Sequence, residues 1–271
     1  MIFDIIRSIF LGVVEGITEW LPISSTGHLI LFNEFLHNDG TFTASDLYIY
    51  VIQLGAILAV VTVFFHKLNP FSPKKTAEEK RGTWQMWAKV IVGCLPAAVI
   101  GLALNDLMDR IENWQVVSAM LIIYGIAFII IEKVNKKVTI TNIDDMSYKT
   151  ALTIGAFQVL SIVPGTSRSG STILGGMIAG CSREVAAEFS FFLAIPVMFG
   201  VSFLKIVKNL DMLSAGNIVI LLVGMAVSYL VSLAAVRFLM GFVKKHTFTV
   251  FGIYRIVLGI AVILCLGVFG L

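Results

Sequence analysis

The sequence predicts an all-α polytopic membrane protein, a single membrane domain over residues 1–271 that is built as an inverted repeat. Of the 271 residues, 58% are hydrophobic and only 14% are charged, and the mean hydropathy is +0.92. A typical soluble domain is about half apolar and about a quarter charged. Long apolar segments recur along the chain, and two shorter ones are each interrupted by a similar turn rich in hydroxyl side chains.

Six apolar stretches are long enough to cross about 30 Å of hydrocarbon as helices. The stretches contain few charged residues and are separated by polar loops. We therefore expect transmembrane helices at 46–65, 88–104, 115–131, 184–204, 216–236 and 250–269.

Two further pairs of apolar segments are too short to span the membrane. Residues 2–14 pair with 28–36, and residues 150–163 pair with 171–180, on either side of a polar turn. Each pair predicts a re-entrant helical hairpin that enters and leaves on one face. Non-helical backbone at this depth persists only where protein or a wet cavity surrounds it, so the two turns should meet inside the protein near the midplane.

Basic side chains are concentrated in three loops, at residues 66–89, 132–149 and 237–246. The loop at 105–114 is mainly acidic. Because loops rich in lysine and arginine remain in the cytoplasm, we expect the first three loops to be cytoplasmic and the fourth to be external.

This orientation gives each half of the chain the same composition of elements. Repeat one (1–132) and repeat two (149–271) each contain one hairpin and three spans, with opposite orientations in the membrane. Both termini are then external. Inverted repeats with broken helices place a binding site between the halves.

The charge balance and the cysteines exclude other classes of site. The net charge is only +3, and the basic residues lie mainly in loops, so we infer no nucleic-acid partner. Cys94, Cys181 and Cys265 are too far apart for a disulfide framework or a cysteine metal site. We expect them to be small buried side chains.

The first polar turn carries Glu15 and Glu19, which lie four residues apart and so share one helix face. Two carboxylates in an apolar setting repel each other and lose hydration, so a proton or a cation should accompany them. Oxygen ligands of this kind suit Mg²⁺ or Ca²⁺, and we expect a divalent cation at Glu15 and Glu19. The alternative is a solvated face of a surface helix.

Ser24, Ser25, Thr26 and His28 follow in the same turn, and His28 is the one histidine within an apolar segment. Histidine can exchange a proton or attack phosphorus, and a serine hydroxyl can attack if a base is near. Such hydroxyls also cap helix N-termini. We expect one hydroxyl to cap a helix and another to take part in chemistry, and we expect Ser24 and Thr26 to bind substrate.

The second polar turn predicts an anion pocket. Small residues before a helix start let backbone N–H groups converge on an anion, and the guanidinium of Arg168 can bind two phosphate oxygens together. The turn is not a Walker A loop, because no Gly-Lys-Ser/Thr closes it. An ion pair of Arg168 with Glu15 or Glu19 is the alternative. The other expected substrate-binding residues of this turn are Gly165, Ser167, Ser169 and Thr172.

Two further polar residues lie within apolar segments. Gln158 occupies the place of Glu15 in the second hairpin, and we expect it to hydrogen-bond across the repeat interface. Arg255 lies a few residues into the last span, from where it could extend to the membrane surface.

A pocket near the midplane that holds acidic, histidine, hydroxyl and arginine side chains suits a lipid phosphate ester or anhydride. The chemistry would be phosphoryl transfer to water, in which positioning and charge neutralisation dominate. The competing interpretation is a transporter or flippase of a lipid phosphate, since broken helices in inverted repeats are also typical of transporters.

Two strings carry a family resemblance. Residues 15–29, EGITEWLPISSTGHL, resemble the first signature of the bacterial undecaprenyl pyrophosphate phosphatases, and residues 164–172, PGTSRSGST, resemble the second. The resemblance extends over the whole chain. It implies hydrolysis of undecaprenyl pyrophosphate to undecaprenyl phosphate and inorganic phosphate in the bacterial inner (plasma) membrane, which recycles the lipid carrier for wall polymers and confers bacitracin resistance.

The resemblance also implies roles for individual residues. Glu15 and Glu19 match the acidic motif, and the positions with catalytic or binding roles match Ser25, His28, Arg168, Ser167 and Thr172. Three nucleophiles remain open: Ser25, His28, or a water activated by His28.

Two further expectations concern the side on which the site opens and the oligomeric state. An opening to the extracytoplasmic side would suit a lipid pyrophosphate left on the outer leaflet. The small residues Gly175, Gly176 and Gly180 predict close helix packing, which is compatible with a homodimer but does not require one.

Overall fold

The computed structural model describes residues 2–25, 27–29, 32, 40–111, 113–134 and 138–268, without the side chains of 102, 104–111 and 268. The described part is helical, and its one extended pairing is a single bridge between Ile140 and Cys181. The longer helices are α1 (Ile2–Thr18), α3 (Asp46–Val63), α5 (Ala77–Ile111), α6 (Trp114–Val134), α7 (Tyr148–Val159), α8 (Arg168–Ile178), α9 (Arg183–Lys208), α10 (Ala215–Phe242) and α11 (Thr249–Val262). Short helical turns complete the described elements: α4 (Phe65–Leu68), η1 (Phe42–Ala44), η2 (Leu160–Ile162), η3 (Leu210–Met212) and η4 (Ile263–Val268).

Six helices in the described part are long and apolar enough to cross a membrane, which confirms the six predicted spans. These segments are Asp46–Val63, Ala77–Gly101, Trp114–Val134, Arg183–Lys208, Ala215–Phe242 and Thr249–Gly267. The sequence-based bounds of α5 were too narrow, because this helix begins at Ala77 and continues to Ile111 through charged residues that hydropathy alone does not include.

Serine side chains determine where several helices begin. Ser45, Ser147, Ser182 and Ser214 each accept a hydrogen bond from the backbone N–H three residues later, at the starts of α3, α7, α9 and α10. A serine at this position satisfies one of the free N–H groups of the first turn.

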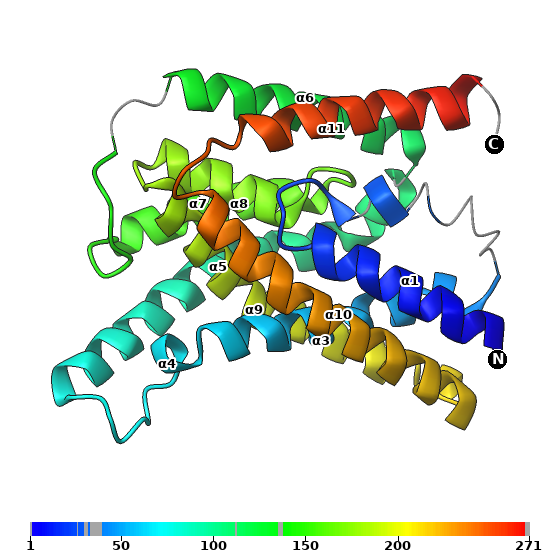
Figure 1. Cartoon of the computed structure of the whole chain (residues 1–271), viewed down its shortest axis with the longest axis horizontal. Helices are drawn as coiled ribbons and strands as arrows, with labels where there is room; N and C mark the ends of the chain where they lie inside the picture. Colours follow the sequence, from blue (N-terminus) through cyan, green and yellow to red (C-terminus); the bar gives the residue numbers. More distant parts are fainter. Residues whose placement is uncertain are drawn as a thin grey trace.

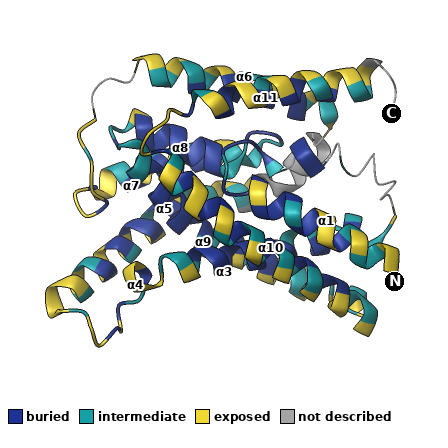
Figure 2. Cartoon of the chain, in the orientation of Figure 1, coloured by how far each residue is buried: buried dark blue, intermediate teal, exposed yellow. Residues whose placement is uncertain are grey.

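The helices are arranged so that two hairpins meet in the interior. In Figure 1, α1 runs inward from the end where α11 terminates, whereas α7 runs inward from the opposite end. α1 packs along α10, α7 packs along α5, and α6 pairs with α11 at the top of the view. The inner ends of the two hairpins lie in the buried centre, and the outer faces of the helices carry the exposed residues (Figure 2). The inverted repeat of the two whole halves stays a prediction.

Close backbone contacts hold α10 against α1 and α3. A Cβ atom at Gly12 would lie 2.8 Å from the Gly224 carbonyl oxygen on α10. At Gly55 of α3, a Cβ would overlap the Met225 carbonyl on α10. These approaches need residues without side chains, as is common between helices in membranes.

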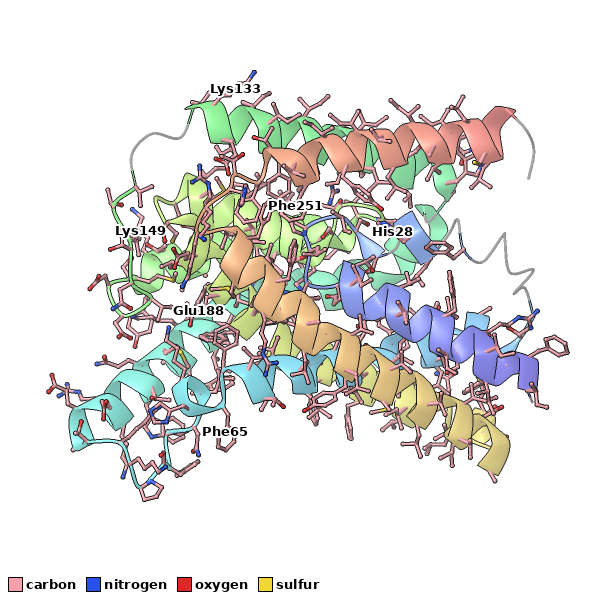
Figure 3. All side chains as sticks on the ribbon, viewed as in Figure 1. His28, Phe65, Lys133, Lys149, Glu188 and Phe251 are labelled. Carbon is pink, nitrogen blue, oxygen red and sulfur yellow. The ribbon has the colours of Figure 1, made fainter. Side chains whose placement is uncertain are left out.

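Basic side chains lie at one end of the molecule. The basic segment between α4 and α5, and the ends of α6 and α7 that carry Lys133 and Lys149, lie at the left end in Figure 3. The start of α1 and the end of α11 lie at the other end (Figure 1).

Of the cysteines, Cys94 and Cys181 are buried as predicted, and Cys265 is half-buried.

Candidate active site

The two hairpin turns have the same local backbone geometry. Ser24 and Ser167 are the non-glycine residues of the described chain with positive φ, at 73° and 74°. The Ser24 Oγ accepts a hydrogen bond from the Gly27 N–H (3.4 Å), and the Ser167 Oγ accepts one from the Gly170 N–H (3.1 Å). Left-handed backbone at a residue with a side chain costs about 1–3 kcal/mol and is concentrated at functional sites. Ser24 and Ser167, both predicted to bind substrate, therefore act in the structure as helix caps.

An ion pair joins the two turns. Arg168 Nη2 donates to Glu19 Oε1 at 2.7 Å, and both side chains are largely buried. Arg168 Nη1 donates to the Ser190 carbonyl on α9 (2.9 Å), and the guanidinium lies over the ring of Trp20. Of the two predicted carboxylate partners of Arg168, the structure selects Glu19.

Ser25 completes this group from the first turn. Its Oγ donates to Glu19 Oε2 at 3.3 Å, so Glu19 contacts a guanidinium through one oxygen and a hydroxyl through the other. Ser25 is only half-buried, unlike Ser24 beside it. A carboxylate within reach of a hydroxyl can accept its proton.

The remaining residues of the second turn hold Arg168 and the turns in place. Ser169 Oγ donates to the Glu19 carbonyl (3.1 Å), which ties the second turn to the first. The Thr172 hydroxyl donates to the Arg168 carbonyl (2.9 Å) and shares a hydrogen bond with the Ser190 hydroxyl. Thr172, predicted to bind substrate, is thus fully buried behind Arg168. Gly165 has a φ of +84° and packs so closely on Val117 of α6 that a Cβ would clash.

His28 belongs to the first hairpin (labelled in Figure 3), and it contacts Tyr254 on α11. Its Nδ1 is 2.7 Å from the Ser24 carbonyl oxygen, and its Nε2 is 2.7 Å from the Tyr254 hydroxyl. The ring stacks on Tyr254 with an interplanar angle of 9°. The hydrogen-bond partner of Ser25 is therefore Glu19, and the partners of His28 are Ser24 and Tyr254. Thr26, which was predicted to bind substrate, lies outside the described residues.

Glu15 is a fully buried carboxylate that makes no hydrogen bond with the described part of the chain. Neither of its side-chain oxygens has a partner among the described residues, although it interacts electrostatically with Glu19 and Arg168. The described residues contain no group of three or more histidine, cysteine or acidic side chains that could hold a metal ion. Mg²⁺ is commonly held by one or two carboxylates together with substrate phosphates, and Glu15 with Glu19 fits that arrangement.

The second hairpin carries an unpaired amide at the matching place. Gln158 is buried, and neither its oxygen nor its nitrogen has a partner within the described chain. The expected hydrogen bond across the repeat interface is therefore wrong for this part of the structure. On the same helix as Gln158, Gly155 packs directly against the backbone of Gly93 on α5.

The prediction that Arg255 extends to the membrane surface is also wrong, because the side chain is fully buried. It donates hydrogen bonds to the carbonyls of Gly165 and Thr166 (both 3.0 Å) in the second turn and of Pro22 (3.3 Å) in the first. A fourth acceptor is the Met120 carbonyl of α6. Arg255 thus connects both hairpins and α6 from its position on α11.

Comparisons with known proteins agree with this geometry. The family described as bacitracin resistance protein BacA matches residues 8–261. The chain belongs to the BacA family. This BacA-family chain is 59% identical over 259 residues to an undecaprenyl-diphosphatase of Enterococcus faecalis, covering 93% of this chain and 94% of the relative.

Other relatives are similar over comparable lengths. An undecaprenyl-diphosphatase of Streptococcus thermophilus is 57% identical over 268 residues, covering 97% of this chain and 93% of the relative. One from Lactiplantibacillus plantarum is 53% identical over 266 residues, covering 96% and 97%. The family resemblance of the two signature strings is confirmed.

Proposed function

We propose that the protein is an undecaprenyl-diphosphatase of the bacterial plasma membrane. It hydrolyses undecaprenyl pyrophosphate to undecaprenyl phosphate and inorganic phosphate, and so returns the lipid carrier to cell-wall synthesis and confers bacitracin resistance. The observation that carries the proposal is the buried Glu19–Arg168 ion pair with Ser25 in contact, between two hairpins from opposite ends of a membrane-spanning fold. Membership of the BacA family and the names of its relatives support it.

Substrate binding would begin with an exchange of partners at Arg168. The guanidinium is held by the Ser190 carbonyl on one side and by Glu19 on the other. A pyrophosphate oxygen pair can replace the carboxylate, since charge-assisted bonds from arginine to phosphate are strong and can be bidentate. Glu19 is then free to act as a base.

Ser25 is the nucleophile that the geometry favours. In this scheme Glu19 accepts the Ser25 proton, and Oγ forms a bond to the terminal phosphorus. The bond from that phosphorus to the bridging oxygen breaks, and undecaprenyl phosphate leaves. Water then hydrolyses the phosphoserine to inorganic phosphate. His28 is a poorer nucleophile here, because both of its ring nitrogens are already engaged.

Replacing Ser25 with alanine is expected to lower the rate of phosphate release by a factor of about 10³ or more, since the nucleophile is lost. In the intact enzyme, a pulse of substrate labelled on the terminal phosphate should leave acid-stable label on the peptide containing Ser25. Ser118→Ala, a buried serine on α6 whose described hydrogen bond is to the Gln115 carbonyl of the same helix, is the control. Acid-labile label on His28, or wild-type rates in Ser25→Ala, would contradict the scheme.

A divalent cation is part of the proposal. Glu15 is its principal ligand, beside Glu19, because its two buried oxygens have no other hydrogen-bond partner in the described structure. When bound, the cation would neutralise phosphate charge and polarise the phosphorus centre.

Purified protein in detergent should release phosphate from undecaprenyl pyrophosphate, and chelation of divalent cations should abolish release until Mg²⁺ or Ca²⁺ is restored. A transporter needs two compartments and would release none, so this assay separates the two functions. Release that is insensitive to chelation would contradict the cation while leaving the phosphatase intact. The variant Arg237→Ala, which replaces an exposed arginine of α10, should release phosphate and respond to chelation as the wild type does.

The orientation and assembly belong to the same proposal. The end with the basic loops faces the cytoplasm, the two halves form an inverted repeat, and the site opens to the extracytoplasmic side. The positive-inside rule supports the first point, and the opposed entry of α1 and α7 supports the second. A homodimer is compatible with the exposed apolar helix faces, which otherwise contact lipid.

A further inference from the structure

Tyr254 on α11 contacts the site from outside both hairpins. Its hydroxyl lies 2.7 Å from Nε2 of His28, and the two rings are stacked with centroids 5.6 Å apart. On the other edge of the imidazole, Nδ1 lies 2.7 Å from the Ser24 carbonyl oxygen. His28 is therefore held from both edges and from one face.

These partners determine where the imidazole carries its proton. A carbonyl oxygen can only accept, so Nδ1 must be the protonated nitrogen. The lone pair of neutral His28 is then on Nε2, and the Tyr254 hydroxyl is its donor. If His28 were doubly protonated, Nε2 would also carry a proton and this hydrogen bond could form only with the hydroxyl turned round.

We propose that Tyr254 is a positioning residue of the active site, whose hydroxyl donates to Nε2 and holds the orientation of the Nδ1–H tautomer that the Ser24 carbonyl sets. Because protonation of Nε2 forces this hydroxyl to turn round, the hydrogen bond couples Tyr254 to the charge state of His28. The catalytic consequence rests on the proposed function, whereas the state of His28 can be measured without it.

The other groups around His28 are charged or already paired. Arg255, next to Tyr254 on α11, is the charged group that acts on His28 from another element. Glu19 and Arg168 lie in the neighbouring ion pair. Phe32 stacks on the imidazole at 6.5 Å. The hydroxyl of Tyr254 is thus the neutral donor that can be removed without changing a charge.

The direct test is nitrogen NMR of a variant in which His37, His66 and His246 are replaced by glutamine, so that His28 gives the only imidazole signals. Neutral His28 should be the Nδ1–H tautomer. In the same background, Tyr254→Phe should shift the pH at which His28 becomes protonated by about 0.5–1 pH unit, as expected for one lost hydrogen bond. An Nε2–H tautomer, or an unchanged titration midpoint, would overturn the proposal.

Kinetics connect this state to the reaction. In Tyr254→Phe, the acid limb of the pH profile of kcat/KM should move by the same amount and in the same direction as the NMR midpoint, and kcat at neutral pH should fall about tenfold with little change in KM. Tyr229→Phe on α10, whose described hydrogen bond is to Thr62 at the surface, is the matched control and should behave as wild type.

The two readouts separate failure of this proposal from failure of the proposed function. A shifted NMR titration in a protein that releases no phosphate in any form supports the role of Tyr254 and contradicts the phosphatase assignment. An active enzyme in which Tyr254→Phe changes KM but moves neither the acid limb nor the NMR midpoint makes Tyr254 a substrate contact, and the positioning role is wrong.

Discussion

Replacing Arg168 with alanine is expected to lower kcat/KM for phosphate release by a factor of about 10³ or more. Arginine groups that stabilise a transferring phosphoryl group contribute about 10³–10⁵ to the rate. Arg168 also joins the two hairpins through its ion pair with Glu19, so its loss removes the guanidinium from that pair and leaves a buried carboxylate behind. Arg168→Lys should be intermediate, because lysine keeps the charge but cannot bind two oxygens in a fork.

The measurement is phosphate release from undecaprenyl pyrophosphate by purified variants, with thermal unfolding to show that each variant is folded. The pair Arg168→Ala and Glu19→Gln removes the unpaired carboxylate, and it should restore stability without restoring activity. Retention of more than a tenth of wild-type kcat/KM in Arg168→Ala would contradict the assigned role.

Replacing Arg255 with methionine is expected to lower kcat/KM about 10²-fold while the spanning helices stay folded. The guanidinium donates to backbone carbonyls of both turns, at Pro22, Gly165 and Thr166, and no other described side chain makes these bonds. Without it the turns can shift relative to each other, and a displacement of about 1 Å near reacting groups can cost about 10²-fold in rate.

Two measurements check this effect. Hydrogen exchange of the amides in the second turn should accelerate in Arg255→Met, because local opening there no longer breaks bonds to α11. Arg255→Lys should recover only part of the activity, since one amine cannot reach acceptors in three segments. Near wild-type activity in Arg255→Met would show that the turns hold their positions without it.

Much of the architecture follows from local properties of the chain. Hydropathy and length are enough to find the six spans, since each span must be apolar along its whole length. Hydroxyl-rich turns at proline, between segments too short to span, predict the breaks at Ser24 and Ser167. For Arg168 the sequence predicts either an anion pocket or an ion pair with Glu15 or Glu19. The ion pair is an alternative because an arginine and a glutamate at membrane depth require partners.

The residues that sequence reasoning missed act through contacts between distant segments. Tyr254 and Arg255 lie in an apolar span more than 80 residues after the second turn, and helical periodicity says nothing about which helix they face. A position near the end of a span favoured an extended Arg255 side chain at the surface, whereas the structure buries it completely. The available signal was the rule that an ionisable residue within a span is usually functional.

The matching geometry of Ser24 and Ser167 has a consequence for protein engineering. Each serine holds the chain in a left-handed turn and is followed directly by a key side chain, Ser25 in one hairpin and Arg168 in the other. The same type of serine-capped turn therefore supports two different functional side chains. A designer could vary the residue after each capping serine and leave the turn intact, so that the pair of hairpins acts as a scaffold with two addressable positions inside a membrane.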